Sequence, residues 1–247
     1  MKLLVDVGNS TVKWALVGAD GLINSHRFVH RGQDVVAQLT RSWVSLQQPA
    51  EVCVVNVAGE AMAHILTDWT RQHWSRTPHF FSTTAAACGV TNAYTSPEQL
   101  GIDRWAALIG AHHQSRGAAC IIDCGTAITL DMLAASGQHQ GGLILPGIDM
   151  LKQVVRQDTA EVRPSEEPAV ATLLATSTGD GVHSGAVFMV VAAIDRIISD
   201  LVAMQGQDVE VLITGGDAGT ILTLLARPAH HDPELVLKGL AILAGEP

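Results

Sequence analysis

Short hydrophobic or alternating runs along the chain predict strands, and longer runs with hydrophobic residues every three or four positions predict helices. The predicted strands are residues 3–7, 11–17, 21–29, 51–57, 79–82, 121–123, 128–133, 137–145, 209–214 and 235–237, and the predicted helices are residues 34–46, 60–74, 97–114, 148–157, 179–204 and 218–226. In each half of the chain, strands come first and helices then alternate with strands. This order indicates an α/β fold with mixed sheets flanked by helices, rather than a doubly wound parallel sheet alone.

The chain contains an internal repeat. One hydrophobic strand leads into Asp6-Val7-Gly8-Asn9-Ser10 and another into Asp123-Cys124-Gly125-Thr126-Ala127, so both copies read Asp-x-Gly followed by small residues. The two copies are separated by nearly half of the 247 residues, and a β-rich stretch follows each of them. Each copy is therefore predicted to be a hairpin with a glycine-containing turn. We predict two related domains, 1–115 and 116–247, whose turns face each other across a cleft.

Composition and charge exclude several classes of protein. With 47% hydrophobic and 16% charged residues, the chain is able to bury a sizeable core. A net charge of −9 without a Lys/Arg cluster argues against binding to nucleic acid or to an anionic membrane. No hydrophobic run reaches the roughly 18 residues of a membrane span, and the early Asp6 argues against a signal peptide. Cys120 and Cys124, four apart on one predicted strand, lie too far apart to form a disulfide, so we expect a reduced, cytoplasmic protein. The four cysteines also lack CxxC pairs, which argues against a zinc site. The polar, proline-containing stretch 157–172 is expected to be an exposed loop.

The first turn has the residue types that bind phosphate. Gly8 allows a close approach of the backbone to a ligand, and successive turn N–H groups are able to point at an anion. Asn9 and Ser10 add neutral donors. Asp6 would repel phosphate directly, so its presence there implies a divalent cation, Mg²⁺, held through water. Lys13, on the returning strand, would neutralise phosphate charge.

The second turn carries similar chemistry. Thr126 offers a hydroxyl and a backbone N–H to a phosphate, and Asp123 is placed at the strand end to hold a cation. One such hairpin alone is better explained as an ordinary surface turn rich in Asp, Gly and Asn. Two copies half a chain apart favour a nucleotide site instead.

Gly101-Ile102-Asp103-Arg104 carries the candidate acceptor chemistry. Phosphoryl transfer needs positioning, charge neutralisation and a group that accepts the hydroxyl proton. Asp103 is the candidate base, and Arg104 is suited to holding a carboxylate with a bidentate fork. Taken alone, the pair is explained equally well as a helix-start Asp and an exposed Arg. Tyr94, the only tyrosine, is either a partly buried anchor or a ligand contact.

In this order the motifs resemble those of type III pantothenate kinase. They are Asp-x-Gly-Asn-Ser, Gly-Ile-Asp-Arg, Asp-x-Gly-Thr-Ala-x-Thr-x-Asp and Gly-Gly-x-x-x-Pro-Gly, and the resemblance extends from Asp6 to Gly239. It implies two ribonuclease H-like domains of the acetate and sugar kinase, Hsp70 and actin superfamily, with a nucleotide cleft between them. It also implies ATP-dependent phosphorylation of the primary hydroxyl of pantothenate, the first step toward coenzyme A. Some members of the family were first described as Bvg accessory factors, which is a regulatory label.

The resemblance also implies a role for individual residues. It assigns the ATP phosphates to Asp6, Val7, Gly8, Asn9, Ser10, Thr11, Val12, Lys13 and Thr126, a potassium or ammonium ion to Asp123, and pantothenate to Tyr94, Gly101, Ile102, Asp103, Arg104 and Thr178. The first motif departs from the family because Ser10 stands where a threonine is common, which retains the hydroxyl.

The sequence also predicts a homodimer. The predicted helix 179–204 is hydrophobic on more than one face, which favours burial against its own sheet and against a partner. The resemblance likewise implies a homodimer in which Thr178 reaches the pantothenate pocket of the partner.

Two alternatives to a kinase stay open: a phosphatase or polyphosphate hydrolase of the same superfamily, and a non-enzymatic regulator that retains the nucleotide cleft.

Overall fold

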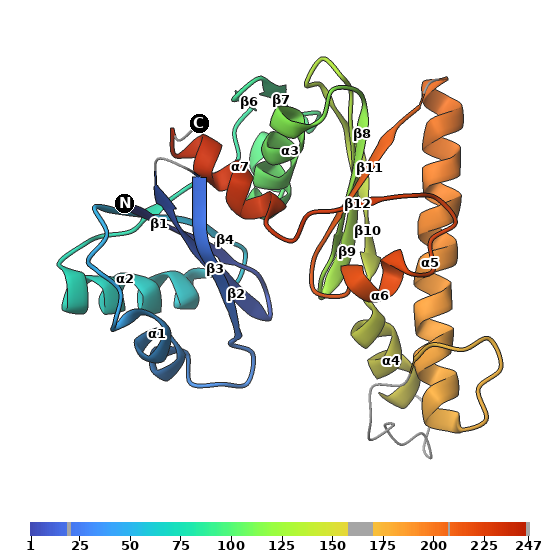
Figure 1. Cartoon of the computed structure of the whole chain (residues 1–247), viewed down its shortest axis with the longest axis horizontal. Coiled ribbons are helices and arrows are strands. Elements are labelled where there is room, and N and C mark those ends of the chain that lie inside the picture. Colours follow the sequence, from blue (N-terminus) through green and yellow to red (C-terminus); the bar gives the residue numbers. More distant parts are fainter. Residues whose placement is uncertain (19–20, 158–169, 207, 246–247) are drawn as a thin grey trace. The chain divides into compact units, whose positions relative to one another are not determined.

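The computed structural model describes residues 1–18, 21–157, 170–206 and 208–245, so most of the predicted loop 157–172 lies outside the described residues. Figure 1 shows the elements along the chain. The strands are β1 (Lys2–Val7), β2 (Thr11–Gly18), β3 (Gly21–Val29), β4 (Glu51–Asn56), β5 (His79–Phe80), β6 (Ala86–Ala87), β7 (Val90–Thr91), β8 (Ala119–Cys124), β9 (Ala127–Leu133), β10 (His139–Pro146), β11 (Glu210–Thr214) and β12 (His230–His231). The helices are α1 (Val35–Trp43), α2 (Glu60–Trp74), the 3₁₀ turn η1 (Pro97–Gln99), α3 (Ile102–Gln114), α4 (Ile148–Gln157), α5 (Thr178–Gln205), α6 (Ala218–Leu222) and α7 (Leu235–Leu243).

The chain divides into two compact units. The first contains Met1–Arg116, Leu133–Gly141 and Glu234–Pro247, and the second contains Gly117–Met132 and Gly142–Pro233. The sequence predicted a single boundary after residue 115, whereas the chain returns to the first unit twice. The turn between β9 and β10 returns because Thr91 pairs with Gln138 and donates its N–H to the Gly137 carbonyl at 2.9 Å.

The first unit is built on a five-stranded mixed sheet in the order β3-β2-β1-β4-β5. β1 pairs antiparallel with β2 and parallel with β4. Because side chains alternate along a strand, Leu3, Val5 and Val7 share one face, where they pack with the tryptophans of α1 and α2. Leu4 and Asp6 consequently point to the opposite face. Figure 1 shows α1 and α2 on one side of this sheet and α3 and α7 on the other.

The second unit repeats this architecture. Its sheet has the order β10-β9-β8-β11-β12, so each strand occupies the place of its counterpart in the first sheet. β8 pairs parallel with β11, as β1 does with β4. The internal repeat seen in the sequence is thus a repeat of topology, and the predicted α/β class with mixed sheets flanked by helices is confirmed.

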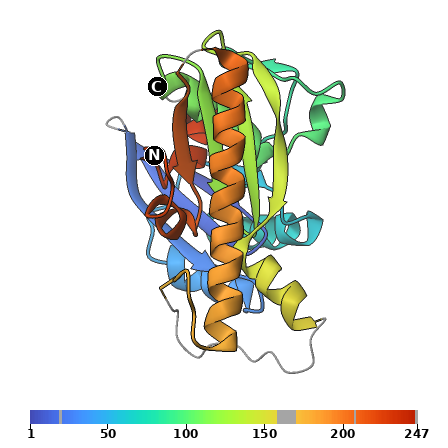
Figure 2. The same ribbon diagram turned by 90° about the vertical axis from the view of Figure 1, so that its right-hand side faces the viewer.

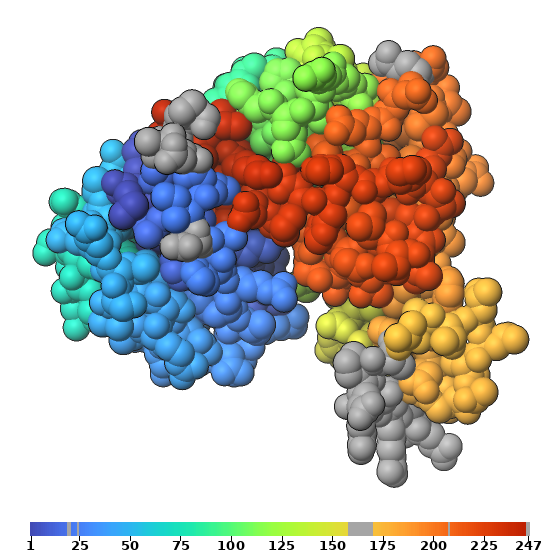
Figure 3. Space-filling model, in the orientation of Figure 1, coloured from blue at the N-terminus to red at the C-terminus, as the bar shows by residue number. Residues whose placement is uncertain are grey.

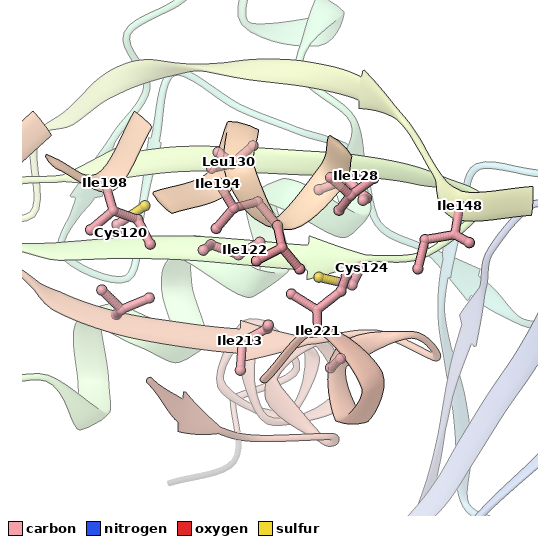
Figure 4. Packing of buried hydrophobic residues seen from close by; sticks show 14 of the residues in the cluster. Cys120, Ile122, Cys124, Ile128, Leu130, Ile148, Ile194, Ile198, Ile213 and Ile221 are labelled. Carbon is pink, nitrogen blue, oxygen red and sulfur yellow. The ribbon is translucent and has the colours of Figure 1, made fainter. Parts of the chain in front are cut away.

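A hydrophobic cluster holds the second unit together. Alternate residues of β8, β9 and β11 face the helices. Figure 4 shows Cys120 and Ile122 near Ile198 and Ile194 of α5, and Cys124 beside Ile221 of α6. Figure 2 shows α5 running along the face of this sheet. The end of β8 and the start of β9 are therefore held in this hydrophobic layer, on either side of the turn that joins them.

The prediction for residues 235–237 was wrong, because this segment begins the helix α7 instead of forming a strand. Most of α7 is buried, so its hydrophobic run shows no helical period. Gly239 packs directly on the backbone of α3, where a side chain would collide with the Ala106 carbonyl. The predicted helix 97–114 is also divided, since η1 ends at Gln99 and α3 begins at Ile102. In the described part of the chain, no helix has the length and hydrophobicity to span a bilayer.

Candidate active site

The first predicted phosphate turn lies between β1 and β2. Its Gly8 N–H donates to the Thr11 carbonyl at 3.0 Å, which closes the turn. The φ angle of Gly8 is not positive, and a Cβ added there would meet only the Thr11 oxygen, at 3.5 Å. Neither the backbone conformation nor the internal packing therefore requires a glycine. Close approach of an external group to the backbone accounts for it better.

Asp6 and Lys13 face each other across this hairpin. The β1–β2 register places them directly opposite, so both point to the same face of the sheet. Asp6 is buried, with 7% of its surface exposed, whereas Lys13 is half-buried. A buried carboxylate at the end of a strand is an expensive feature unless it has partners or binds a cation.

The second predicted phosphate turn lies between β8 and β9. The Gly125 N–H donates to the Ala127 carbonyl at 3.1 Å, and a Cβ on Gly125 would again meet a turn oxygen at 3.5 Å. The Gly147 N–H donates to the Thr126 carbonyl at 3.2 Å and so holds this turn from the start of α4. Thr126 itself is half-buried.

Asp123, at the end of β8, packs against the loop that follows β11. A Cβ on Gly215 would lie 2.5 Å from Asp123 Oδ1 and would overlap the Cys124 carbonyl, so this position requires glycine. The Asp217 N–H donates to the same carbonyl at 3.0 Å. The glycine pair of residues 215–216 therefore brings a second carboxylate, which the sequence analysis did not assign, to the end of β8.

Negative charge accumulates at this end of the second sheet. Burial and the Asp149 carboxylate raise the pKa of Asp217, and Lys152 and His183 lower it in part. Burial, Asp123 and Asp217 together raise the pKa of the Cys124 thiol. Lys152 is itself paired with Asp149 at 2.7 Å. Within the described ranges, no three His, Cys, Asp or Glu side chains are arranged to hold a metal. A cation here would consequently need backbone oxygens, water or phosphate as further ligands.

The predicted acceptor residues gather at the start of α3. Asp103 lies in the first turn and its Oδ1 accepts the Arg104 N–H at 2.8 Å. A Cβ on Gly101 would lie 2.6 Å from this oxygen, so glycine makes room for the carboxylate. Arg104 is 6% exposed, and its Nη1 donates to the Tyr94 hydroxyl at 3.1 Å. The guanidinium carbon lies 5.8 Å from the centre of the Tyr94 ring.

Tyr94 also lies next to a histidine that sequence reasoning missed. His139, on β10, is fully buried and stacks on Tyr94 with a centroid separation of 6.0 Å. Its Nδ1 accepts the Ala93 N–H at 3.4 Å. The segment of residues 93–94 is thus held between β10 and α3.

The structure brings together some predicted site residues and separates others. Tyr94 and residues 101–104 form one group in the first unit, which also carries the turn of residues 6–13. Asp123, Thr126 and Thr178 belong to the second unit, where Thr178 is the exposed first residue of α5. Sequence reasoning missed His139 and Asp217. Of these, only Asp217 had a local signal, since it follows the glycine pair.

Comparison with known proteins defines the family. Residues 2–200 match the model of the family described as type III pantothenate kinase. The chain is 41% identical over 250 residues to the type III pantothenate kinase of Nitrosococcus oceani, covering 99% of this chain and 94% of the relative. It is 38% identical over 245 residues to that of Halorhodospira halophila, covering 97% and 96%.

A solved structure extends the comparison of the fold. A Sinorhizobium meliloti protein named as a 2-dehydro-3-deoxygalactonokinase superposes with a TM-score of 0.57 over 99% of this chain and 98% of that chain, at 18% identity. At this identity the likeness shows the fold alone, which is the two-domain fold of sugar kinases and actin-like ATPases. The match of sequence over nearly the full length is what decides the relationship: the chain belongs to the type III pantothenate kinase family.

Proposed function

We propose that this chain transfers the γ-phosphoryl group of ATP to the primary hydroxyl of pantothenate, giving 4′-phosphopantothenate in the first step of coenzyme A biosynthesis. The observation that carries the acceptor site is the group formed by Asp103, Arg104 and Tyr94 at the start of α3. Asp103 would accept the hydroxyl proton while the oxygen–phosphorus bond forms and ADP leaves. Arg104 and Tyr94 would hold the carboxylate end of pantothenate, since a guanidinium binds carboxylates well. Gly101 and Ile102 would line the same pocket. The proposed location is the cytoplasm, as the cysteine pattern predicts.

The ATP phosphates are proposed to contact Asp6, Val7, Gly8, Asn9, Ser10, Thr11, Val12 and Lys13 in the first unit and Thr126 in the second. The residues present fit a bound Mg²⁺, because Asp6 is a buried carboxylate next to a phosphate turn and Mg²⁺ usually takes one or two carboxylates, phosphates and water. When bound, Mg²⁺ neutralises charge on the phosphates. Asp123 is proposed to hold potassium or ammonium. The Asp217 carboxylate, which like Asp123 acts on Cys124, and Asp149 next to Asp217 support a need for positive charge there.

A homodimer is the proposed assembly. One face of α5 is buried against its own sheet, but Met189 on this helix remains 54% exposed. Next to its N-terminal turns, residues 170–177 lie on the surface in Figure 3, and Val170, Leu173 and Leu174 are each more than 80% exposed. Exposed hydrophobic groups of this kind are typical of protein interfaces. Covering them with a second copy would let Thr178 serve the pantothenate site of the partner.

The test of the base is Asp103→Asn. Asparagine keeps the oxygen that accepts the Arg104 N–H, so the fold should persist, but the side chain no longer takes up a proton. We expect kcat to fall by about 10²–10⁴-fold while ATP still raises the melting temperature. Asp34→Asn is the matched control, since Asp34 also begins a helix and asparagine caps equally well. Turnover within a few-fold of wild type in the Asp103 variant would refute the assignment.

The alternative functions give different results in the same assay. A phosphatase or polyphosphate hydrolase would release phosphate at the same rate with and without pantothenate. A regulator that only retains the cleft would bind ATP without turnover. The group at the start of α3 favours a hydroxyl acceptor over water, because it offers a cation and an aromatic hydroxyl beside the base.

A further inference from the structure

We propose that His30 is a positioning residue for the phosphate turn of residues 8–10, and that it acts by fixing the orientation of the peptide between Gly8 and Asn9. This inference rests on the proposed binding of ATP phosphates to that turn. Nothing in the motif itself points to His30, which follows β3 and lies outside the repeat.

His30 holds both carbonyls that flank Asn9. Its Nε2 lies 2.8 Å from the Gly8 oxygen, and its backbone N–H donates to the Ser10 oxygen at 3.0 Å. A carbonyl only accepts, so Nε2 is the donor in the first bond, as it would be in either protonation state of the ring. Only 9% of His30 is exposed, whereas Asn9 is exposed. The histidine therefore holds the turn from its buried side.

The geometry of the peptide bond turns this contact into a directional effect. In a trans peptide the C=O of one residue and the N–H of the next point in opposite directions, and the described chain has no cis peptide. Holding the Gly8 oxygen toward His30 therefore directs the Asn9 N–H away from it, toward the exposed side of the turn. A turn N–H aimed outward in advance would bind a phosphate oxygen without first losing conformational freedom.

In the second phosphate turn a backbone group, the Gly147 N–H, holds the carbonyl of Thr126, which is the counterpart of Asn9 in the repeat. In the first turn a side chain holds the Gly8 carbonyl, so mutation can remove that hydrogen bond and leave the main chain intact. This difference makes the role of His30 testable.

The experiment compares His30→Asn with His30→Gln in the full-length protein. The glutamine amide nitrogen reaches about as far as Nε2, whereas that of asparagine is one methylene short. For His30→Asn we expect KM for ATP to rise about fivefold to tenfold, which corresponds to the loss of about one hydrogen bond. KM for pantothenate should stay within twofold, and the stabilisation by ATP in thermal melts should shrink. His30→Gln should restore both ATP readouts. Asp34→Ala, which removes the α1 cap, serves as a control that lowers stability without changing KM for ATP.

The outcomes separate this inference from the proposed function. If Lys13→Ala and Gly8→Ala raise KM for ATP but His30→Asn matches His30→Gln, the positioning role is refuted and the phosphate turn stands. If none of these variants changes KM for ATP or the ATP-dependent melting shift, the turn does not bind ATP and both fail. A purely structural role would lower the melting temperature and change KM for both substrates equally or not at all, and that result would also overturn the proposal.

Discussion

Replacing Gly8 with alanine should stabilise the free protein and yet weaken ATP binding. The φ angle of Gly8 suits any residue, and the added Cβ would touch only the Thr11 oxygen, at an ordinary 3.5 Å. Alanine at such a position restricts the unfolded chain and gains about 0.4–1 kcal/mol. For a chain of this size, that gain raises the melting temperature by about 1–4 °C.

The loss of ATP affinity follows from the same methyl group. If phosphate lies against the backbone of the turn, the Cβ displaces it and removes about one charge-assisted hydrogen bond, which contributes roughly 1.5–3 kcal/mol. At about 1.4 kcal/mol per tenfold, the dissociation constant for ATP rises about 10- to 100-fold. With ATP at 100 times the wild-type dissociation constant, ligand stabilisation of about 2.7 kcal/mol would fall to about 0.4 kcal/mol for a 100-fold loss.

Thermal melts with and without ATP, together with KM for each substrate, measure both effects. Gly117→Ala is the matched control, since a Cβ there has no atom within 4 Å and Gly117 precedes β8, at the opposite end of that strand from the second turn. It should raise stability and leave kinetics unchanged. Gly125→Ala in the second turn should behave like Gly8→Ala. A Gly8→Ala protein with unchanged KM for ATP, or one whose melting temperature drops by several degrees, would refute the close-approach argument.

Three further predictions concern the cation, the dimer and a buried thiol. Activity should be high in potassium or ammonium and weak in sodium alone, because the carboxylates around Asp123 need a bound cation; equal rates would contradict this. Co-expressed Thr178→Ala and Asp103→Asn chains should recover about a quarter of wild-type activity through mixed dimers, and no recovery would exclude a shared site. Burial and Asp131 raise the pKa of Cys120 from 9.0 to about 12. The unfolded chain then loses this proton first, so stability should fall as pH rises from about 9 toward 12, and less steeply in Cys120→Ala. If the melting temperatures of wild type and Cys120→Ala fell equally with pH, the raised pKa of Cys120 would not be the cause.

The sequence predicted the elements around the two turns well, because the information there is local. A hydrophobic strand, an Asp-x-Gly turn and a second strand lie within about fifteen residues, and β1, β2, β8 and β9 form where the pattern places them. The order Gly101-Ile102-Asp103-Arg104 is equally local, but the predicted helix 97–114 placed it after the first turn, whereas α3 begins at Ile102. The predicted helix 179–204 began one residue too late, since Thr178 is the first residue of α5.

The features that escaped prediction depend on contacts between distant segments. The start of α7 was predicted as a strand because the helix is buried against α3 and so has hydrophobic residues on most of its faces. Its sequence therefore does not show hydrophobic residues at every third or fourth position. His30 reaches Gly8 across 22 residues and His139 reaches Tyr94 across the length of β8 and β9, and no motif records either contact. The chain also returns to the first unit at the end of β9 and again after β12. The prediction of two continuous domains, 1–115 and 116–247, did not include these returns.

The two turns have the same topology but different charge environments, and this difference supports assigning the monovalent cation to the second. In the first unit, Asp6 faces Lys13 across the hairpin, so a carboxylate and an ammonium occupy opposite positions. In the second unit, Asp123 lies near Asp217, and burial and the Asp149 carboxylate raise the pKa of Asp217. The nearby Lys152 is already paired with Asp149. A polyphosphate brought to the second turn would add charge to a region that is already anionic. A bound cation would relieve that repulsion, whereas Lys13 meets part of the same need at the first turn.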